Sequence, residues 1–160
     1  MKKPVLAFVF ALCLSAAASA QTAVYVVRHA EKIGESMNHP STELSETGKK
    51  RAENLAEILR DAGITTIYVT DTVRARETAR PLAEALGVTP QIYEGRDTDG
   101  LVKRIRAKHP SETVLVVGHE NTIGDIIRGF GYRGKISTRY GNLFAVVPNG
   151  DRATVLQLHF

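Results

Sequence analysis

The sequence predicts an α/β fold, a three-layer sandwich in which a mostly parallel central sheet carries helices on both faces. Short apolar segments of strand length alternate with segments of helical periodicity from residue 23 to residue 130. The first apolar segment, residues 23–27, is apolar throughout, which is typical of a strand buried on both faces of a parallel sheet. Such an alternation joins parallel strands through helical crossovers, and these cover the sheet.

The first half of the chain after residue 27 supplies two helical segments and one strand. A helix is expected from about Ser45, whose hydroxyl suits an N-cap, to Gly63. Residues 64–70 are rich in β-branched and aromatic side chains and predict the second strand. The helical pattern over residues 72–86 stops at Gly87, and Pro81 within it predicts a break into two short helices.

The second half continues the alternation and then closes with a hairpin. The expected elements are a strand over residues 89–93, a helix over 99–108, a strand over 113–118 and a helix over 122–130. Residues 143–147 and 153–158, joined by Asn149-Gly150, predict the hairpin. The polar residues 33–43 predict a loop over the carboxyl ends of the strands.

The amino terminus has the pattern of a signal peptide. Two lysines precede an apolar run over residues 5–14, and Ala18-Ser19-Ala20 fits a cleavage site. The run is too short to span a membrane, and Leu12 before Cys13 is not the small residue that a lipoprotein site requires. We therefore expect residues 1–20 to be removed, leaving residues 21–160 as one periplasmic or secreted domain without a membrane anchor.

Composition excludes several kinds of site from that domain. Cys13 is the only cysteine, so the domain after cleavage has no disulfide, thiol nucleophile or cysteine-bound zinc. The formal net charge of +4 falls to +2 when Lys2 and Lys3 are removed with the leader. Basic residues are interspersed with acidic ones, so nucleic acid is not an expected partner.

Four cationic or imidazole side chains follow strands of the predicted sheet. Arg28 and His29 come directly after the first strand, Arg74 comes after the second, and His119 follows the strand over residues 113–118. In open α/β sheets, ligands bind in the crevice beyond the carboxyl ends of the strands. We therefore expect these four side chains to converge there.

This set of side chains suits a phosphoryl group. Arginine binds a phosphate through forked hydrogen bonds and keeps its charge, which makes Arg28 and Arg74 candidates for binding it. A neutral histidine can attack phosphorus, and the arginines favour a neutral His29. His119 is a further candidate for stabilising the phosphoryl oxygens. With this much positive charge, no metal and no cofactor is expected.

Three ordered motifs carry a resemblance to a known family. Arg28-His29-Ala30 stands where that family has R-H-G, residues 70–79 match its S-x-x-x-R-A-x-x-T-A segment except at the first position, and Val117-Gly118-His119 matches its V-G-H. The chain thus resembles the histidine phosphatase superfamily, with its phosphoglycerate mutase-like fold, over residues 23–158. The R-H-A-E-K start resembles a small secreted or SixA-like subgroup. The resemblance implies that His29 is the phosphorylated nucleophile and that Arg28, Arg74 and His119 complete the phosphate pocket.

The resemblance leaves the general acid open. In one branch of the family a glutamate follows the third strand, and Glu94 holds that place here. In the other branch an acid directly follows the second histidine, as Glu120 does. Glu94 is the first choice, followed by Glu120 and then Asp97.

The expected function is that of an exported phosphatase acting on phosphomonoesters or related phosphoryl compounds through phospho-His29. Its substrate would be a phosphorylated small molecule or a cell-envelope phosphosugar. One alternative is a SixA-like phosphohistidine protein phosphatase, which the signal peptide disfavours because those substrates are cytoplasmic. The other is a protein that binds phosphate or another anion without catalysis.

Overall fold

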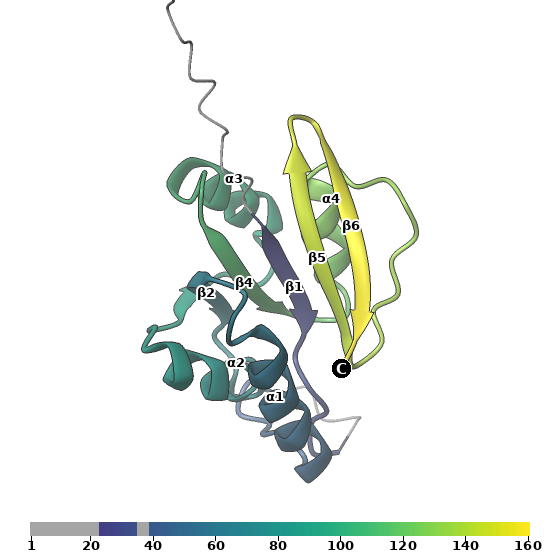
Figure 1. Ribbon diagram of the computed structural model, residues 1–160. Coiled ribbons are helices and arrows are strands. Elements are labelled where there is room, and N and C mark those ends of the chain that lie inside the picture. Colours follow the sequence, from purple (N-terminus) through teal and green to yellow (C-terminus); the bar gives the residue numbers. More distant parts are fainter. Residues whose placement is uncertain (1–22, 35–38) are drawn as a thin grey trace, which may run out of the picture.

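A computed structural model describes residues 23–34 and 39–160 of the chain (Figure 1). The predicted signal peptide, residues 1–20, lies outside the described residues, as does part of the predicted loop over residues 33–43. Among the described residues, no helix has the length and apolar character needed to cross a membrane.

The centre of the fold is a six-stranded, mostly parallel sheet, as predicted. Its strand order is β3-β2-β4-β1-β5-β6, with β3, β2, β4 and β1 parallel to one another. The hairpin of β5 and β6 adds to β1 in the antiparallel sense. The strands are β1 Val24–Arg28, β2 Ile64–Thr70, β3 Gln91–Tyr93, β4 Thr113–Gly118, β5 Asn142–Asn149 and β6 Arg152–His159.

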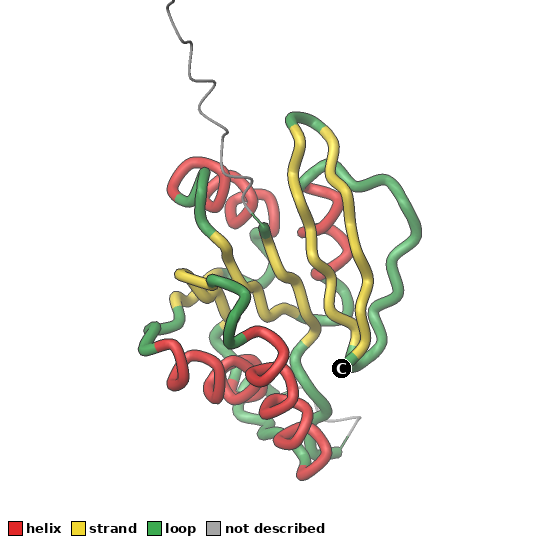
Figure 2. Tube along the Cα trace, in the orientation of Figure 1, coloured by secondary structure: helices red, strands yellow, loops and turns green. Residues whose placement is uncertain are grey.

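Helices cover both faces of the sheet, which confirms the predicted three-layer sandwich (Figures 1 and 2). On one face, side chains of α1 and α2 form a buried cluster with β1, β2 and β4. On the other face, α3 and α4 form a second buried cluster with the same strands. The helices are α1 Glu46–Leu59, α2 Val73–Leu86, α3 Thr98–Lys108 and α4 Ile123–Gly129.

Helix α2 corrects one prediction, because Pro81 lies inside a single continuous helix and does not divide it. Proline removes one backbone hydrogen bond from the helix. Ala79 before Pro81 and Leu82 after it are both fully buried on the same helix face. Burial of this continuous apolar face between the sheet and α1 holds the two halves in line.

Other elements differ from the predictions only at their ends. Strand β3 begins at Gln91 because Pro90 has no N–H to give to a ladder. Helix α1 ends at Leu59, and Gly63, with φ +70°, ends the turn that follows. The hairpin turn uses Gly150 and Asp151, since Asn149 still pairs with Arg152.

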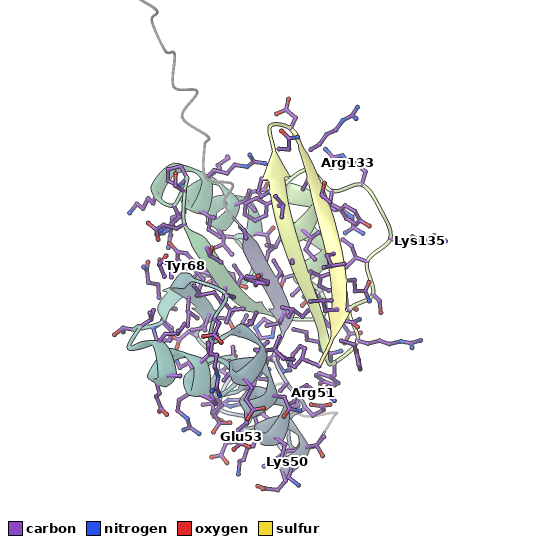
Figure 3. The ribbon with its side chains drawn as sticks, viewed as in Figure 1. Lys50, Arg51, Glu53, Tyr68, Arg133 and Lys135 are labelled. Atoms are coloured by element: carbon purple, nitrogen blue, oxygen red, sulfur yellow. The ribbon has the colours of Figure 1, made fainter. Side chains whose placement is uncertain are left out.

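Helix α1 packs against the backbone that follows β1. Its N-cap is Ser45, as predicted, and the Ser45 hydroxyl accepts a hydrogen bond from the Gly48 N–H at 3.1 Å. A side chain at Gly48 would lie only 2.1 Å from the Glu31 carbonyl oxygen. Lys50 and Glu53 extend outward from the opposite, exposed side of the helix (Figure 3). The lack of a side chain at Gly48 therefore lets α1 contact the segment after β1.

We predict that Gly48→Ala lowers the free energy of unfolding by about 1–3 kcal/mol, because the added methyl group must displace backbone atoms. In a helix with no close neighbour at this position, a glycine-to-alanine change would raise the free energy of unfolding by about 1 kcal/mol. The sign of the change therefore shows whether the close contact exists. Urea denaturation measures it, and Lys50→Ala on the exposed side is the control, with a change within about 0.5 kcal/mol. A stabilised Gly48→Ala variant would contradict the close contact.

Candidate active site

The ends of the two central strands bring the candidate histidines together. In the parallel pairing of β1 with β4, Arg28 lies opposite Gly118. The His29 N–H donates to the Gly118 carbonyl at 2.9 Å and extends this ladder by one residue. The imidazole rings of His29 and His119 lie 5.2 Å apart, centre to centre. The predicted convergence of these two residues is therefore present in the fold.

Hydrogen bonds fix the orientation of the buried His29 ring. Its Nδ1 lies 2.7 Å from the Ala30 carbonyl oxygen, which can only accept, so we assign the ring proton to Nδ1. Nε2 then carries the lone pair, and it accepts a hydrogen bond from Arg74 Nε at 3.1 Å. The side chain of Ala30, the residue that replaces the family's glycine, is buried with Leu44 and Ala52.

The surroundings of His29 keep it neutral. Burial lowers its pKa most, and repulsion from His119, Arg74 and Arg28 lowers it further, whereas the hydrogen bond to Ala30 acts in the opposite direction. The net result is a pKa of about 3, compared with the usual 6.5. A neutral ring with its lone pair on Nε2 is the form that can act as a nucleophile.

Arg74 is a buried cation without a carboxylate partner. Its side chain donates to His29 Nε2, to the His39 carbonyl at 3.0 Å and, at 3.5 Å, to His119 Nδ1. Among the described residues, no carboxylate lies within ion-pair distance of its guanidinium. Burial lowers the pKa of Arg74. An uncompensated buried charge is costly, and a bound anion would relieve that cost.

Thr78 ties Arg74 to the end of β1. Its hydroxyl donates to the Arg74 carbonyl at 2.7 Å and accepts from the Ala30 N–H at 2.9 Å. The start of α2 is thereby held against the backbone that carries His29. Thr78 occupies the threonine position of the R-A-x-x-T-A motif, so the motif itself was the signal for this contact.

His119 is also neutral and faces Arg74. The guanidinium of Arg74 can only donate, so Nδ1 of His119 accepts and we assign the proton to Nε2, which lies 2.8 Å from the Thr70 hydroxyl. Burial, followed by repulsion from Arg74 and Arg28, lowers the pKa of His119 to about 4.

Arg28, the residue before His29, is held by three contacts. Its Nη2 pairs with a carboxylate oxygen of Glu120 at 2.9 Å, and its Nη1 donates to the Thr138 carbonyl at 3.2 Å. The guanidinium carbon is 3.7 Å from the centre of the Tyr140 ring. Tyr140 was missed by sequence reasoning because it lies in an irregular segment without a motif.

The three candidate acids have different surroundings. Glu94 and Glu120 both line the cavity at the strand ends. Glu120 forms the ion pair with Arg28, whereas Asp97 caps α3 by accepting from the Gly100 N–H at 2.9 Å. The turn at Glu94 and Gly95 packs close to His119, since a side chain at Gly95 would come within 3.9 Å of that ring.

One cavity of about 950 Å³ lies at the carboxyl ends of the strands. The candidate residues other than Asp97 line it together with Tyr140: Arg28, His29, Arg74, His119, Glu94 and Glu120. Its wall is mostly polar and includes further charged side chains, Lys32, Asp71 and Arg96. A second hollow of about 660 Å³, between α2 and β3, is largely apolar and contains none of the candidate residues. In the described part of the chain, no three His, Cys, Asp or Glu side chains are grouped as a metal site would need.

Comparison with known proteins agrees with this geometry. The family model of the histidine phosphatase superfamily, branch 1, matches residues 24–97, which include Arg28, His29 and Arg74. Residues 24–97 therefore match the histidine phosphatase superfamily. This match supports phosphatase activity. No curated protein matches the sequence.

Solved structures of phosphatases share the fold of this chain. The protein histidine phosphatase SixA, complexed with tungstate, aligns with a TM-score of 0.75 and 15% identity, covering 86% of this chain and 97% of SixA. The alpha-ribazole phosphatase from Shigella flexneri aligns with a TM-score of 0.73 and 16% identity, covering 87% and 96% of the two chains. The mycobacterial glucosyl-3-phosphoglycerate phosphatase aligns with a TM-score of 0.63 and 14% identity, covering 87% of this chain and 98% of that chain.

We predict that the native His29 and His119 rings titrate with midpoints near pH 3 and pH 4, as histidine ring NMR signals would show. Both values lie below the unfolded value, so the unfolded state binds more protons between these midpoints and pH 6.5. The free energy of unfolding should therefore fall as the pH is lowered through 6.5, by up to roughly 2 kcal/mol per histidine at pH 5. Native midpoints near 6.5 would contradict the buried, neutral assignment.

Proposed function

We propose that the protein hydrolyses phosphomonoesters or related phosphoryl compounds through a phosphohistidine intermediate on His29. The observation that carries this proposal is the pairing of a neutral His29 with Arg74, a buried cation without a carboxylate partner among the described residues. A phosphate monoester carries roughly two negative charges near pH 7 and would supply the missing anion. Its phosphorus would then lie beside the histidine nitrogen.

The reaction has two steps. On binding, a phosphoryl oxygen replaces His29 Nε2 as the acceptor of the Arg74 hydrogen bond, which frees the lone pair. Nε2 attacks phosphorus, the bond to the ester oxygen breaks, and the leaving oxygen takes a proton from the general acid. Water then attacks phospho-His29, the same residue removes its proton, and inorganic phosphate leaves. Arg28 and Arg74 stabilise the phosphoryl oxygens in both steps. His119 joins them when its ring proton moves to Nδ1 and the Thr70 hydroxyl donates to Nε2.

Glu94 is the general acid that we propose. Its carboxylate borders the cavity, and the adjoining Gly95 packs near His119. Glu120 is occupied as the ion-pair partner of Arg28, and Asp97 is occupied as the N-cap of α3. Glu94 also lines the cavity, and its carboxylate accepts a hydrogen bond from the Arg96 N–H at 3.4 Å. Among the described residues it forms no ion pair and caps no helix, which distinguishes it from the other two acids.

We further propose that the protein is exported to the periplasm or secreted, with cleavage after Ala20, because residues 1–20 have the signal-peptide pattern. The natural substrate would be a phosphorylated small molecule or a cell-envelope phosphosugar. The mostly polar wall of the cavity suits a leaving group that forms hydrogen bonds.

A phosphohistidine protein phosphatase is the second candidate. The observation that favours it is the fold shared with the protein histidine phosphatase SixA. The same His29 chemistry would apply, with a nitrogen in place of the leaving oxygen. A phosphorylated histidine-containing protein, offered in competition with sugar phosphates, distinguishes the two substrate classes.

We predict that His29→Asn lowers kcat for an aryl phosphate by at least about 1,000-fold, because the covalent route is lost. Brief incubation of the wild type with labelled substrate should also trap an acid-labile phosphohistidine, which the variant lacks. The control is Lys50→Ala, on the exposed side of α1, which should leave kcat unchanged. Phosphate binding without turnover by the wild type would instead identify a non-catalytic anion-binding protein.

We predict that Glu94→Gln lowers hydrolysis of an alkyl phosphate by about 100-fold or more, because a poor leaving group needs a proton. The first-turnover release of p-nitrophenol should change little, because this leaving group needs no acid, whereas the later hydrolysis of phospho-His29 slows for both substrates. Glu120→Gln serves as the comparison, and through Arg28 it should raise KM for both substrates alike. If Glu120→Gln slows hydrolysis of the alkyl phosphate alone and Glu94→Gln does not, Glu120 is the general acid.

A further inference from the structure

Tyr140 contacts both residues of the Arg28-His29 pair. Its ring lies under the Arg28 guanidinium, with 3.7 Å between the guanidinium carbon and the ring centre. The same ring is 5.9 Å from the His29 imidazole, centre to centre, at an angle of 60°. A single aromatic side chain thus borders two of the groups assigned to the phosphoryl site.

The Tyr140 ring completes the support of Arg28. Thr138 and Glu120 bind the two terminal nitrogens of the guanidinium, and both contacts lie at its edge. Neither contact prevents the guanidinium plane from rotating about the line that joins these two nitrogens. The Tyr140 ring covers one face and supplies this restraint, since a guanidinium stacks readily on an aromatic ring.

The segment that carries Tyr140 is itself anchored to the sheet. The Asn142 side chain at the start of β5 donates to the Ser137 carbonyl at 2.9 Å and to the Ser137 hydroxyl at 3.1 Å. Gly141, with φ +79°, makes the turn between Tyr140 and β5. Asn142 pairs in turn with His159 of β6. Tyr140 is therefore held at a fixed place relative to β1, which carries Arg28.

We propose that Tyr140 is a positioning residue that acts through Arg28, holding the guanidinium plane so that its fork faces the phosphoryl oxygens. This inference rests on the proposed phosphoryl site. A long arginine side chain that is not held in place must be ordered each time an anion binds, which weakens binding. The ring is what this role requires, and the hydroxyl is dispensable.

Isothermal titration with inorganic phosphate tests the proposal on the full domain, with kcat and KM for an aryl phosphate measured in parallel. We expect Tyr140→Leu to weaken phosphate binding about tenfold and to raise KM accordingly. Tyr140→Phe, which keeps the ring, should bind phosphate within about threefold of the wild type. Circular dichroism and thermal unfolding identify any variant that has lost its fold.

A double-mutant cycle tests whether Tyr140 acts through Arg28. Arg28→Lys keeps the charge and removes the planar group. In the Arg28→Lys variant, Tyr140→Leu should therefore weaken phosphate binding by less than about twofold. The control Tyr132→Leu, in the same segment but packed on the α3–α4 side of the sheet, should leave phosphate affinity unchanged.

Two results would overturn the positioning role. The first is that Tyr140→Leu weakens phosphate binding by the same factor in the wild type and in Arg28→Lys. The second is that Tyr140→Phe weakens phosphate binding as much as Tyr140→Leu does. If the wild type binds phosphate in this Tyr140-dependent way but turns over no phosphoester, the proposed activity fails and the positioning role stands.

Discussion

The parallel register between β1 and β4 is the constraint on which the site depends. Pairing of Arg28 with Gly118 places the residues after both strands at the same level, and the hydrogen bond from His29 to Gly118 fixes that level. A shift of one residue would turn His29 to the other face of the sheet. The buried valines of both strands oppose such a shift, because each must stay within its own apolar layer. Core packing thus determines the distance between the two imidazoles.

Positive charge in the site is only partly balanced by carboxylates among the described residues. Arg28 has a carboxylate partner in Glu120, whereas among the described residues Arg74 has only neutral acceptors. Burial and mutual repulsion hold both histidines neutral, so the cost of burying charge falls mainly on Arg74. The same features that destabilise the empty site favour a phosphoryl group in it.

The secondary elements illustrate what could be read from residues alone. Apolar strands, the Ser45 cap and the glycines at helix ends are local signals, and the strand and helix order follows from them. The predicted break at Pro81 was wrong. Proline is a local signal against a helix, whereas α2 is held by an apolar face that packs over its whole length. The turn residues of the hairpin were misplaced by one, since register belongs to the pairing of two strands.

By itself, the sequence determined the α/β alternation, the family motifs and the identity of the four side chains at the strand ends, because each is a pattern within a short segment. Only the tertiary structure decided which nitrogen of His29 is free, which acid is left without a capping or ion-pair role, and that Tyr140 supports Arg28. These properties depend on burial and on hydrogen-bond and ion-pair partners and, for Tyr140 and Arg28, on a contact between residues more than a hundred positions apart. No local pattern encodes such contacts.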